Sequence, residues 1–190
     1  MNKREFLAAG ALVAALSLLA GCTTSGSSSG DPAARRAAID ADVQTALTRL
    51  YDQVRGSREL VSSARGVLVF PSVVSAGFMI GGSHGQGALQ KNGKTVRNFT
   101  MTAASVGLLA GARTKSVFYL FMAEDALARF EASSGWTVGA DASVTVINVG
   151  ANAQVDTRNV QQPVIGFVLT NTGLMGNLSM DGTRIAPLNF

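Results

Sequence analysis

The feature that most constrains the fold is a long strand-like, glycine-rich stretch from Val67 to Tyr119. It opens with the apolar run 67–70, directly before Pro71, which predicts a buried strand. Turn signals follow at Gly81-Gly82 and at Asn92-Gly93, and an Asn-Gly pair between apolar runs is a strong signal for a two-residue β-hairpin. This stretch predicts strands joined by short turns, with no repeating strand–helix unit that would favour a parallel sheet.

Two helical patterns precede this stretch. Asp31 as N-cap and Pro32 in the first turn predict a helix start. Six apolar residues then follow at three- and four-residue spacing, which places them on one helical face: Ile39, Val43, Leu47, Leu50, Tyr51 and Val54. We expect Gly56 to end this helix and Ser57 to cap a second, short helix that runs through Ala64 and closes at Gly66.

The last third of the chain predicts one helix among further strands. Glu124 to Ala132 is helical in pattern, and Trp136 to Val149 alternates as a long strand would. A hairpin is expected where 171–173 (Asn-Thr-Gly) joins Val164–Thr170 to Leu174–Met180, and Asp181-Gly182 predicts another turn. The fold class is therefore α+β: N-terminal helices packed on a mostly antiparallel, glycine-rich β-sheet, with barrel-like closure left open and one inserted helix.

The N-terminus has the layout of an export signal, because the basic Lys3 and Arg4 precede a short apolar run that ends at Ala20. The four residues 19–22 (Leu-Ala-Gly-Cys) resemble the lipobox of bacterial lipoproteins. That resemblance implies cleavage before Cys22 and acylation of its thiol and amino group, with palmitate as an expected acyl chain. The alternative is an ordinary signal peptide with an incidental cysteine.

The expected organisation is a lipoprotein signal peptide at 1–21, a Gly/Ser tether at 22–30 and a single domain at 31–190. Thr23, where lipoproteins of the inner membrane usually carry aspartate, favours the outer membrane. The expected location is thus the bacterial cell envelope, with the domain anchored by lipid and either facing the periplasm or the surface.

Charge is unevenly distributed along the chain. Between Glu59 and Glu124 there are six basic residues and no acidic one. On an anchored protein the nearest anionic partner is the phospholipid headgroup layer, whereas an exported lipoprotein rarely meets nucleic acid. The alternative is a basic surface that only aids solubility. The candidate headgroup contacts are Lys91, Lys94, Arg97, Arg113 and Lys115.

The hairpin places some of these candidates. Lys91 and Lys94 flank Asn92-Gly93 and are expected to project into solvent, while Arg113 and Lys115 share one strand face. If these residues do not bind, the next candidates lie in the N-terminal helix: Arg35, Arg36 and Arg49.

Enzyme chemistry is poorly supported. Gly81 to Gly85 fits the G-x-S-x-G pattern, but Ser83 is adjacent to His84, the only histidine, and no strand-to-helix context follows. The glycines could be read as a phosphate loop, yet bulges and close strand contact are the preferred interpretation. Asp141 and Asp156 are the acids to check, and Asp141 is expected to be solvated or turn-bonded. No catalytic residue, metal site or cofactor is predicted.

Several segments together are similar to the SYLF family of lipid-binding domains, over roughly residues 40 to 190. They are 65–71 (RGVLVFP), 76–78 (AGF), 104–108 (ASVGL), 136–144 (WTVGADASV), 150–151 (GA) and 167–175 (FVLTNTGLM). The resemblance implies lipid binding and no catalytic residues. Eukaryotic members bind phosphoinositides through a basic N-terminal segment, and some bind actin. Here that segment is charge-balanced, and an actin role does not fit a bacterial envelope.

The sequence therefore favours two alternative functions. The first is a membrane-anchored lipoprotein whose domain binds phospholipid through anionic headgroups. The second is a structural or protein-interaction lipoprotein of the envelope that uses lipid only as an anchor, with an unknown protein partner.

Overall fold

The computed structural model describes residues 31–147, 162–170, 173–174 and 180–190. Residues 33–190 form one compact unit. The elements, in chain order, are α2 (Pro32–Gln53), α3 (Ser57–Ser63), β1 (Gly66–Lys91), β2 (Lys94–Phe121), α4 (Glu124–Ala132), β3 (Trp136–Thr137), β4 (Thr145–Val146), β5 (Val164–Thr170), β6 (Gly173–Leu174) and β7 (Arg184–Pro187). Within the described ranges, no helix combines the length and apolarity needed to cross a bilayer.

The predicted N-terminal helix is confirmed as α2, and its apolar face is buried. The prediction for Ser57 is wrong. Gly56, with a φ of 81°, occupies the N-cap position of α3, and Ser57 is the first residue of that helix. The buried Ser57 hydroxyl instead donates to the Val54 carbonyl at 2.7 Å, with the Leu50 carbonyl at 3.2 Å. The Leu50 and Val54 carbonyls also accept the backbone N–H groups of Val54 and Ser57, so the hydroxyl reinforces the junction between α2 and α3.

The β1–β2 hairpin dominates the sheet. It runs from the pair Gly66↔Phe121 to the pair Lys91↔Lys94, and Asn92 and Gly93 have φ values of 50° and 72°. Positive φ at both turn residues is the type I′ geometry that an Asn-Gly pair favours, so the predicted hairpin is confirmed. The second predicted turn is wrong, because Gly81 and Gly82 continue β1 and pair with β2.

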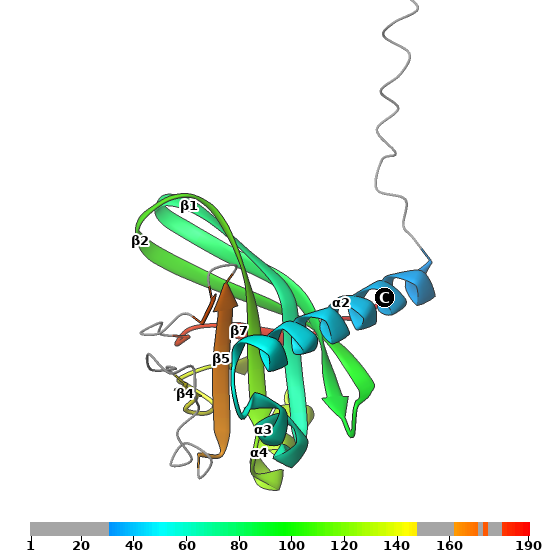
Figure 1. The fold of residues 1–190 in the computed structure, drawn as a ribbon. Helices are drawn as coiled ribbons and strands as arrows, with labels where there is room; N and C mark the ends of the chain where they lie inside the picture. The colour runs from blue at the N-terminus through cyan, green and yellow to red at the C-terminus, as the bar shows by residue number, and fades with distance from the viewer. Residues whose placement is uncertain (1–30, 148–161, 171–172, 175–179) are drawn as a thin grey trace, which may run out of the picture. The chain divides into compact units, whose positions relative to one another are not determined.

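The hairpin bends back on itself in its middle (Figure 1). A register shift between Gly77 and Met79 divides it into a base half, 66–77 paired with 111–121, and a distal half, 79–91 paired with 94–107. The Ser75 and Ser83 hydroxyl oxygens, one from each half of β1, lie 2.8 Å apart. A Cβ at Gly87 would collide with the Val69 carbonyl oxygen, so glycine is what permits this approach. Close strand contact, the preferred interpretation of these glycines, is confirmed.

The remaining strands extend the sheet from both halves of β2. β5 pairs antiparallel with the base half of β2, and β7 pairs antiparallel with its distal half. β3 lies on β7, β6 lies antiparallel on β5, and β4 runs parallel to β5. The result is a mostly antiparallel, strongly curled half-barrel with α4 inserted between strands (Figure 1), which confirms the α+β class.

The segment after α4 departs from expectation. The single strand predicted from Trp136 to Val149 is wrong, because the described residues 136–147 contain two short strands, β3 and β4, with a turn between them. Gly139 has a φ of 89°, and the Asp141 carboxylate accepts a hydrogen bond from the Thr137 N–H at 2.6 Å. Asp141 is thus turn-bonded, as predicted. The Asp181-Gly182 turn is also confirmed, with a φ of 77° at Gly182.

Buried apolar side chains of the described residues form two clusters on opposite faces of the sheet. Val67 and Val69 face the cluster that includes α2, whereas Leu68 and Phe70 face the cluster that includes α4 and Trp136. Both faces of the sheet are therefore covered at residues 67–70, which explains the uninterrupted apolar run there. The signal 1–21, the tether 22–30 with Cys22, Asp156 and the turn residues 171–172 lie outside the described residues.

Candidate functional site

The five predicted headgroup contacts are distributed over both halves of the hairpin. Lys91, Lys94 and Arg97 belong to the distal half of the hairpin. Arg113 and Lys115 belong to the base half, where they pair with Ser75 and Val73 of β1. The structure therefore divides the basic stretch into two groups at different places on the sheet.

The two lysines at the hairpin end differ from each other. Lys94 is exposed, as predicted. Lys91 is not free in solvent, because its Nζ lies 2.7 Å from Glu131 Oε2 of α4 and only 33% of its side chain is exposed. The sequence separation of the two partners hides this ion pair from a local interpretation. Much of the charge of Lys91 is consequently matched within the domain.

Arg113 and Lys115, the two basic residues of the base half, also differ in their exposure to solvent. Arg113 is exposed, whereas Lys115 is half-buried and its burial lowers the pKa of its ammonium group below the ordinary value. A partly desolvated lysine is a weaker contact for a headgroup than a fully solvated one. Of the two, Arg113 alone is well placed for solvent-side contact.

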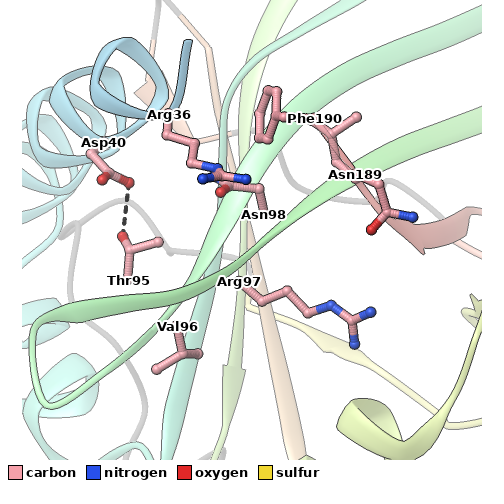
Figure 2. Close-up of a pocket in the computed structure, with 9 residues that line it drawn as sticks. Arg36, Asp40, Thr95, Val96, Arg97, Asn98, Asn189 and Phe190 are labelled. Atoms are coloured by element: carbon pink, nitrogen blue, oxygen red, sulfur yellow. Dashed lines mark hydrogen bonds between the residues drawn. The ribbon is translucent and has the colours of Figure 1, made fainter. Parts of the chain in front are cut away.

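Arg97 lines a groove of about 490 Å³ between α2, the start of β2 and residues 188–190 (Figure 2). A bulge helps to build this groove. Gln90 pairs with Thr95 and Leu89 pairs with Arg97, so Val96 has no partner in the ladder and is 50% exposed. Such a bulge re-aims the side chains that follow it. We refer to the cavity as the Arg97 groove; its lining is Arg36, Asp40, Thr95, Val96, Arg97, Asn98, Leu188, Asn189 and Phe190.

α2 contributes a second cation to the Arg97 groove. Arg36 lies with its guanidinium carbon 5.2 Å from the centre of the Phe190 ring, and Arg35 lies 4.9 Å from the same ring. Figure 2 shows the Arg36 side chain reaching from the helix toward Phe190 and Asn98. Cation–π contacts of this kind orient guanidinium groups without neutralising them. Arg36, expected only as a secondary candidate, therefore lines the same groove as Arg97. The Arg97 side chain points away from Arg36 in Figure 2, and its guanidinium carbon lies 5.8 Å from the centre of the Phe99 ring.

One acidic residue also lines the Arg97 groove. Asp40 Oδ1 accepts a hydrogen bond from the Thr95 hydroxyl at 2.8 Å, which links α2 to the beginning of β2 (Figure 2). The groove thus has two guanidinium groups and one carboxylate. These side chains carry charges of both signs.

Asn98 is the residue that sequence reasoning missed. Only 7% of its surface is exposed, and its Nδ2 has no hydrogen-bond partner within the part of the chain that the structure describes. Its backbone carbonyl accepts from the Leu188 N–H at 2.9 Å, which holds the C-terminal segment against β2. Nothing local in the sequence marks this asparagine, because its burial depends on α2 and on residues far along the chain.

A second, smaller groove of about 290 Å³ lies between α2, α3 and the hairpin end. Arg58 lies over the Tyr51 ring there, with 4.2 Å from the guanidinium carbon to the ring centre. Burial raises the pKa of the Tyr51 phenol, and the nearby Arg58 charge opposes that shift. Arg58 is exposed and is the one charged residue in the lining of this groove, which therefore offers an external anion fewer cations than the Arg97 groove does.

The serine-glycine pattern lies within β1 rather than at a strand-to-helix turn. The Ser83 hydroxyl is bonded to the Ser75 hydroxyl, and the exposed His84 pairs with Thr102 of β2. Among the described residues no group of three or more His, Cys, Asp or Glu is placed to hold a metal ion.

Comparison with known protein families gives a match over part of the chain. Residues 102–189 match the Ysc84 family, described as Las17-binding protein actin regulator. This match supports a SYLF-type domain, a class related to lipid binding and actin regulation. It begins within β2 and ends at Asn189 of the Arg97 groove, so Arg36, Arg97 and Asn98 precede it. A search of curated proteins gave no significant match.

Proposed function

We propose that this chain is a lipid-anchored protein of the bacterial envelope whose domain binds anionic phospholipid headgroups at the Arg97 groove. The observation that supports this proposal is that two exposed arginines, Arg36 and Arg97, both border one groove. They come from α2 and β2, which are distant in sequence, and yet they line one groove.

Guanidinium groups suit phosphate because their planar fork of donors matches two phosphate oxygens at once. Each basic residue held near an anionic membrane surface contributes about 1 kcal/mol to binding. Arg36 and Arg97 are both exposed, so their attraction would be screened by salt. Binding should accordingly be modest, selective for anionic lipid and salt-sensitive.

The proposal for the anchor rests on the sequence. Leu19-Ala20-Gly21 before Cys22 has the pattern of a lipoprotein cleavage point. Mass spectrometry of the mature protein should find an acylated Cys22 at its N-terminus, and Cys22→Ser should release the protein from the membrane fraction, since several acyl chains anchor far better than one. An unmodified Cys22, or cleavage elsewhere, would contradict the anchor.

Headgroup binding is tested without the anchor. A chain of residues 31–190 contains both apolar clusters and should sediment with vesicles of phosphatidylglycerol but not with vesicles of phosphatidylcholine alone. The bound fraction should fall as the salt concentration rises from 0.1 M to 1 M, where the Debye length shrinks from about 10 Å to about 3 Å. Equal binding to both kinds of vesicle would reject the electrostatic mechanism and leave a protein partner as the favoured function.

A further inference from the structure

We propose that Phe190 is a positioning residue for headgroup binding, because its ring gathers Arg35 and Arg36 of α2 into one site for the phosphate of an anionic lipid. This inference rests on the proposed function, since it adds residues to the surface beside the same groove. It extends the site to Arg35, which does not line the Arg97 groove. It also gives a role to an apolar residue that a charge pattern cannot identify.

The first step is the contact of two guanidinium groups with one ring. The guanidinium carbon of Arg35 lies 4.9 Å from the centre of the Phe190 ring, and that of Arg36 lies 5.2 Å from the same centre. Figure 2 shows the Arg36 guanidinium beside this ring. Both distances are within the range of cation–π attraction, about 6 Å. Two like charges are therefore held around a single side chain.

Phe190 is itself fixed to the sheet. β7 pairs with β2 as far as Pro187, opposite Phe99, and the Leu188 N–H then donates to the Asn98 carbonyl at 2.9 Å. Phe190 is half-buried and packs against the apolar cluster that includes α2. A ring held in this way restricts where the arginine side chains of the neighbouring helix can lie.

The second step concerns the charge of the two arginines. Both are exposed, and neither belongs to an ion pair among the described residues. Asp40 follows Arg36 by four residues, a spacing at which opposite charges on a helix can pair. Its Oδ1 instead accepts the Thr95 hydroxyl (Figure 2). The phenyl ring of Phe190 has no carboxylate oxygen, so the guanidinium donors stay available to an external anion.

The third step identifies that anion as a phosphate ester. A guanidinium presents a planar fork of donors that matches two phosphate oxygens at once. A flexible arginine loses side-chain freedom when it binds, and a residue that orders it beforehand lowers this cost. Phe190 should therefore strengthen phosphate binding without touching the phosphate. A zwitterionic headgroup should bind more weakly, because the same arginines repel its ammonium group.

The place of the two arginines in the chain favours a lipid as the source of the phosphate. Arg35 and Arg36 lie near the start of α2, which begins at Pro32. Residues 22–30 can span at most roughly 30 Å when fully extended. An acylated Cys22 would thus keep the start of α2 within reach of the membrane surface, whereas a soluble ester has no such advantage.

Nitrogen-15 spectra of the full chain in neutral detergent micelles test the site, with dihexanoyl phosphatidylglycerol as the anionic probe. We expect the Nε signals of Arg35 and Arg36 to shift, at a titration midpoint about tenfold lower than for dihexanoyl phosphatidylcholine. Glycerol 1-phosphate, which has no acyl chains, should likewise need about ten times the concentration. A midpoint equal to that of phosphatidylglycerol would assign the site to a soluble ester and overturn the choice of a lipid. An unmoved Arg35 signal would overturn the site itself.

Arg35→Gln tests whether the site reaches beyond the Arg97 groove. The midpoint for phosphatidylglycerol should rise about fivefold, which corresponds to about 1 kcal/mol for one base near an anionic surface. An unchanged midpoint would exclude Arg35 from the site and overturn the inference.

Phe190→Leu tests the positioning role, because it keeps an apolar side chain and removes the ring. The midpoint should rise about threefold, the size of a cation–π contact at an exposed position, and the Arg35 and Arg36 Nε signals should move even without lipid. Phe190→Tyr keeps the ring and should bind as the wild type does. If Phe190→Leu does not fold, Phe190→Met serves the same comparison. Tyr51→Leu is the matched control: it removes the ring that lies 4.2 Å from the Arg58 guanidinium carbon and should leave the midpoint unchanged.

The combination of Phe190→Leu with Arg35→Gln and Arg36→Gln separates positioning from direct contact. A residue that acts only through the two arginines has no further effect once they are removed. A loss that Phe190→Leu still causes in this background would show that the ring contacts the lipid itself, and it would overturn the positioning role. Equal midpoints for Phe190→Leu and the wild type would overturn it as well.

The fate of the proposed function is read separately. If Arg35→Gln and Phe190→Leu bind as the wild type does while Arg36→Gln with Arg97→Gln weakens binding, headgroup binding at the Arg97 groove stands and this inference fails. If the wild type does not prefer the anionic probe to the zwitterionic one, both fail together.

Discussion

The two halves of the β1–β2 hairpin share a ladder but differ in how they are covered. The first part of the base half, 66–70 paired with 117–121, is buried on both faces, with Phe70, Tyr119 and Phe121 toward α4 and Val69 and Phe118 toward α2. Val74, further along the base half, is 48% exposed. The distal half also buries Leu89 and Phe99, yet it exposes Val96 and Arg97 and forms one wall of the groove. One strand pair therefore supplies both the core and the candidate site.

The difference also separates two groups of basic residues that look equivalent in sequence. Arg113 and Lys115 stand in the base half and do not line the groove that Arg36 of α2 lines. Arg97 stands in the distal half, where α2 brings Arg36 to the same cavity. Of the five basic residues, Arg97 is thus the one that lines a described groove together with a cation from another element.

The largest expected effect tests whether the distal half is packed on the base half. Gly87→Ala should lower the free energy of unfolding by about 3 kcal/mol, because its Cβ would collide with the Val69 carbonyl oxygen. Gly82→Ala is the control, since the nearest atom to its Cβ is the Ala103 carbonyl oxygen at 3.9 Å. The control should match or slightly exceed wild-type stability in urea titrations. Equal stability of the two variants would mean that the halves are not in close contact.

The second prediction concerns the buried base half. Burial raises the pKa of the Tyr119 phenol, and a hydrogen bond with Thr183 acts weakly in the other direction. Above pH 10 the unfolded chain loses this proton while the folded chain keeps it, so the free energy of unfolding falls by about 1.4 kcal/mol per pH unit. Tyr119→Phe should remove this part of the slope, measured by denaturant titration between pH 9 and pH 11.

Two other groups contribute to the same pH range. The pKa of Tyr51 is also raised by burial, so it adds a loss of the same sign. The pKa of Lys115 is lowered by burial, and this lysine favours the folded state as the pH rises toward its ordinary value of 10.5. Comparison of Tyr119→Phe with Tyr51→Phe isolates the base half. An unchanged slope in Tyr119→Phe would contradict the burial of its phenol.

The smallest expected effect on stability concerns the ion pair at the hairpin end. Lys91→Gln removes the ion pair with Glu131 and should cost about 0.5 kcal/mol of stability, decreasing with salt, because both side chains are about one-third exposed. Lys94→Gln has no such partner among the described ion pairs and should leave stability unchanged. Identical effects of the two variants at low salt would show that α4 does not hold the end of the distal half.

Local sequence signals account for much of the fold. The apolar spacing of α2, the Asn92-Gly93 turn and the run 67–70 each depend on neighbours in the chain, and each prediction was confirmed. The predicted turn at Gly81-Gly82 was wrong because these glycines lie within the paired β1, in which Gly85 and Gly87 allow close approach of the two halves. A glycine that permits a distant contact cannot be told from a turn glycine by its neighbours alone.

The candidate site was less predictable for a related reason. Arg97 was found from the charge run, but Asn98 carries no signal until α2 and residues 188–190 bury it. Lys91 was expected in solvent because Glu131 is distant in sequence. When the role of a residue depends on partners from other elements, patterns along the sequence therefore do not predict that role. The headgroup roles of all five basic residues remain predictions.

Vesicle sedimentation of matched double variants tests the central claim most directly. With residues 31–190 and phosphatidylglycerol vesicles at 0.1 M salt, Arg36→Gln with Arg97→Gln should weaken binding about 30-fold, which corresponds to about 1 kcal/mol for each base. Arg113→Gln with Lys115→Gln removes the same formal charge from the base half and should weaken binding less than about threefold, since these residues lie outside the groove and Lys115 is half-buried. Equal losses in the two pairs would show that net charge, and not the Arg97 groove, determines binding to the membrane.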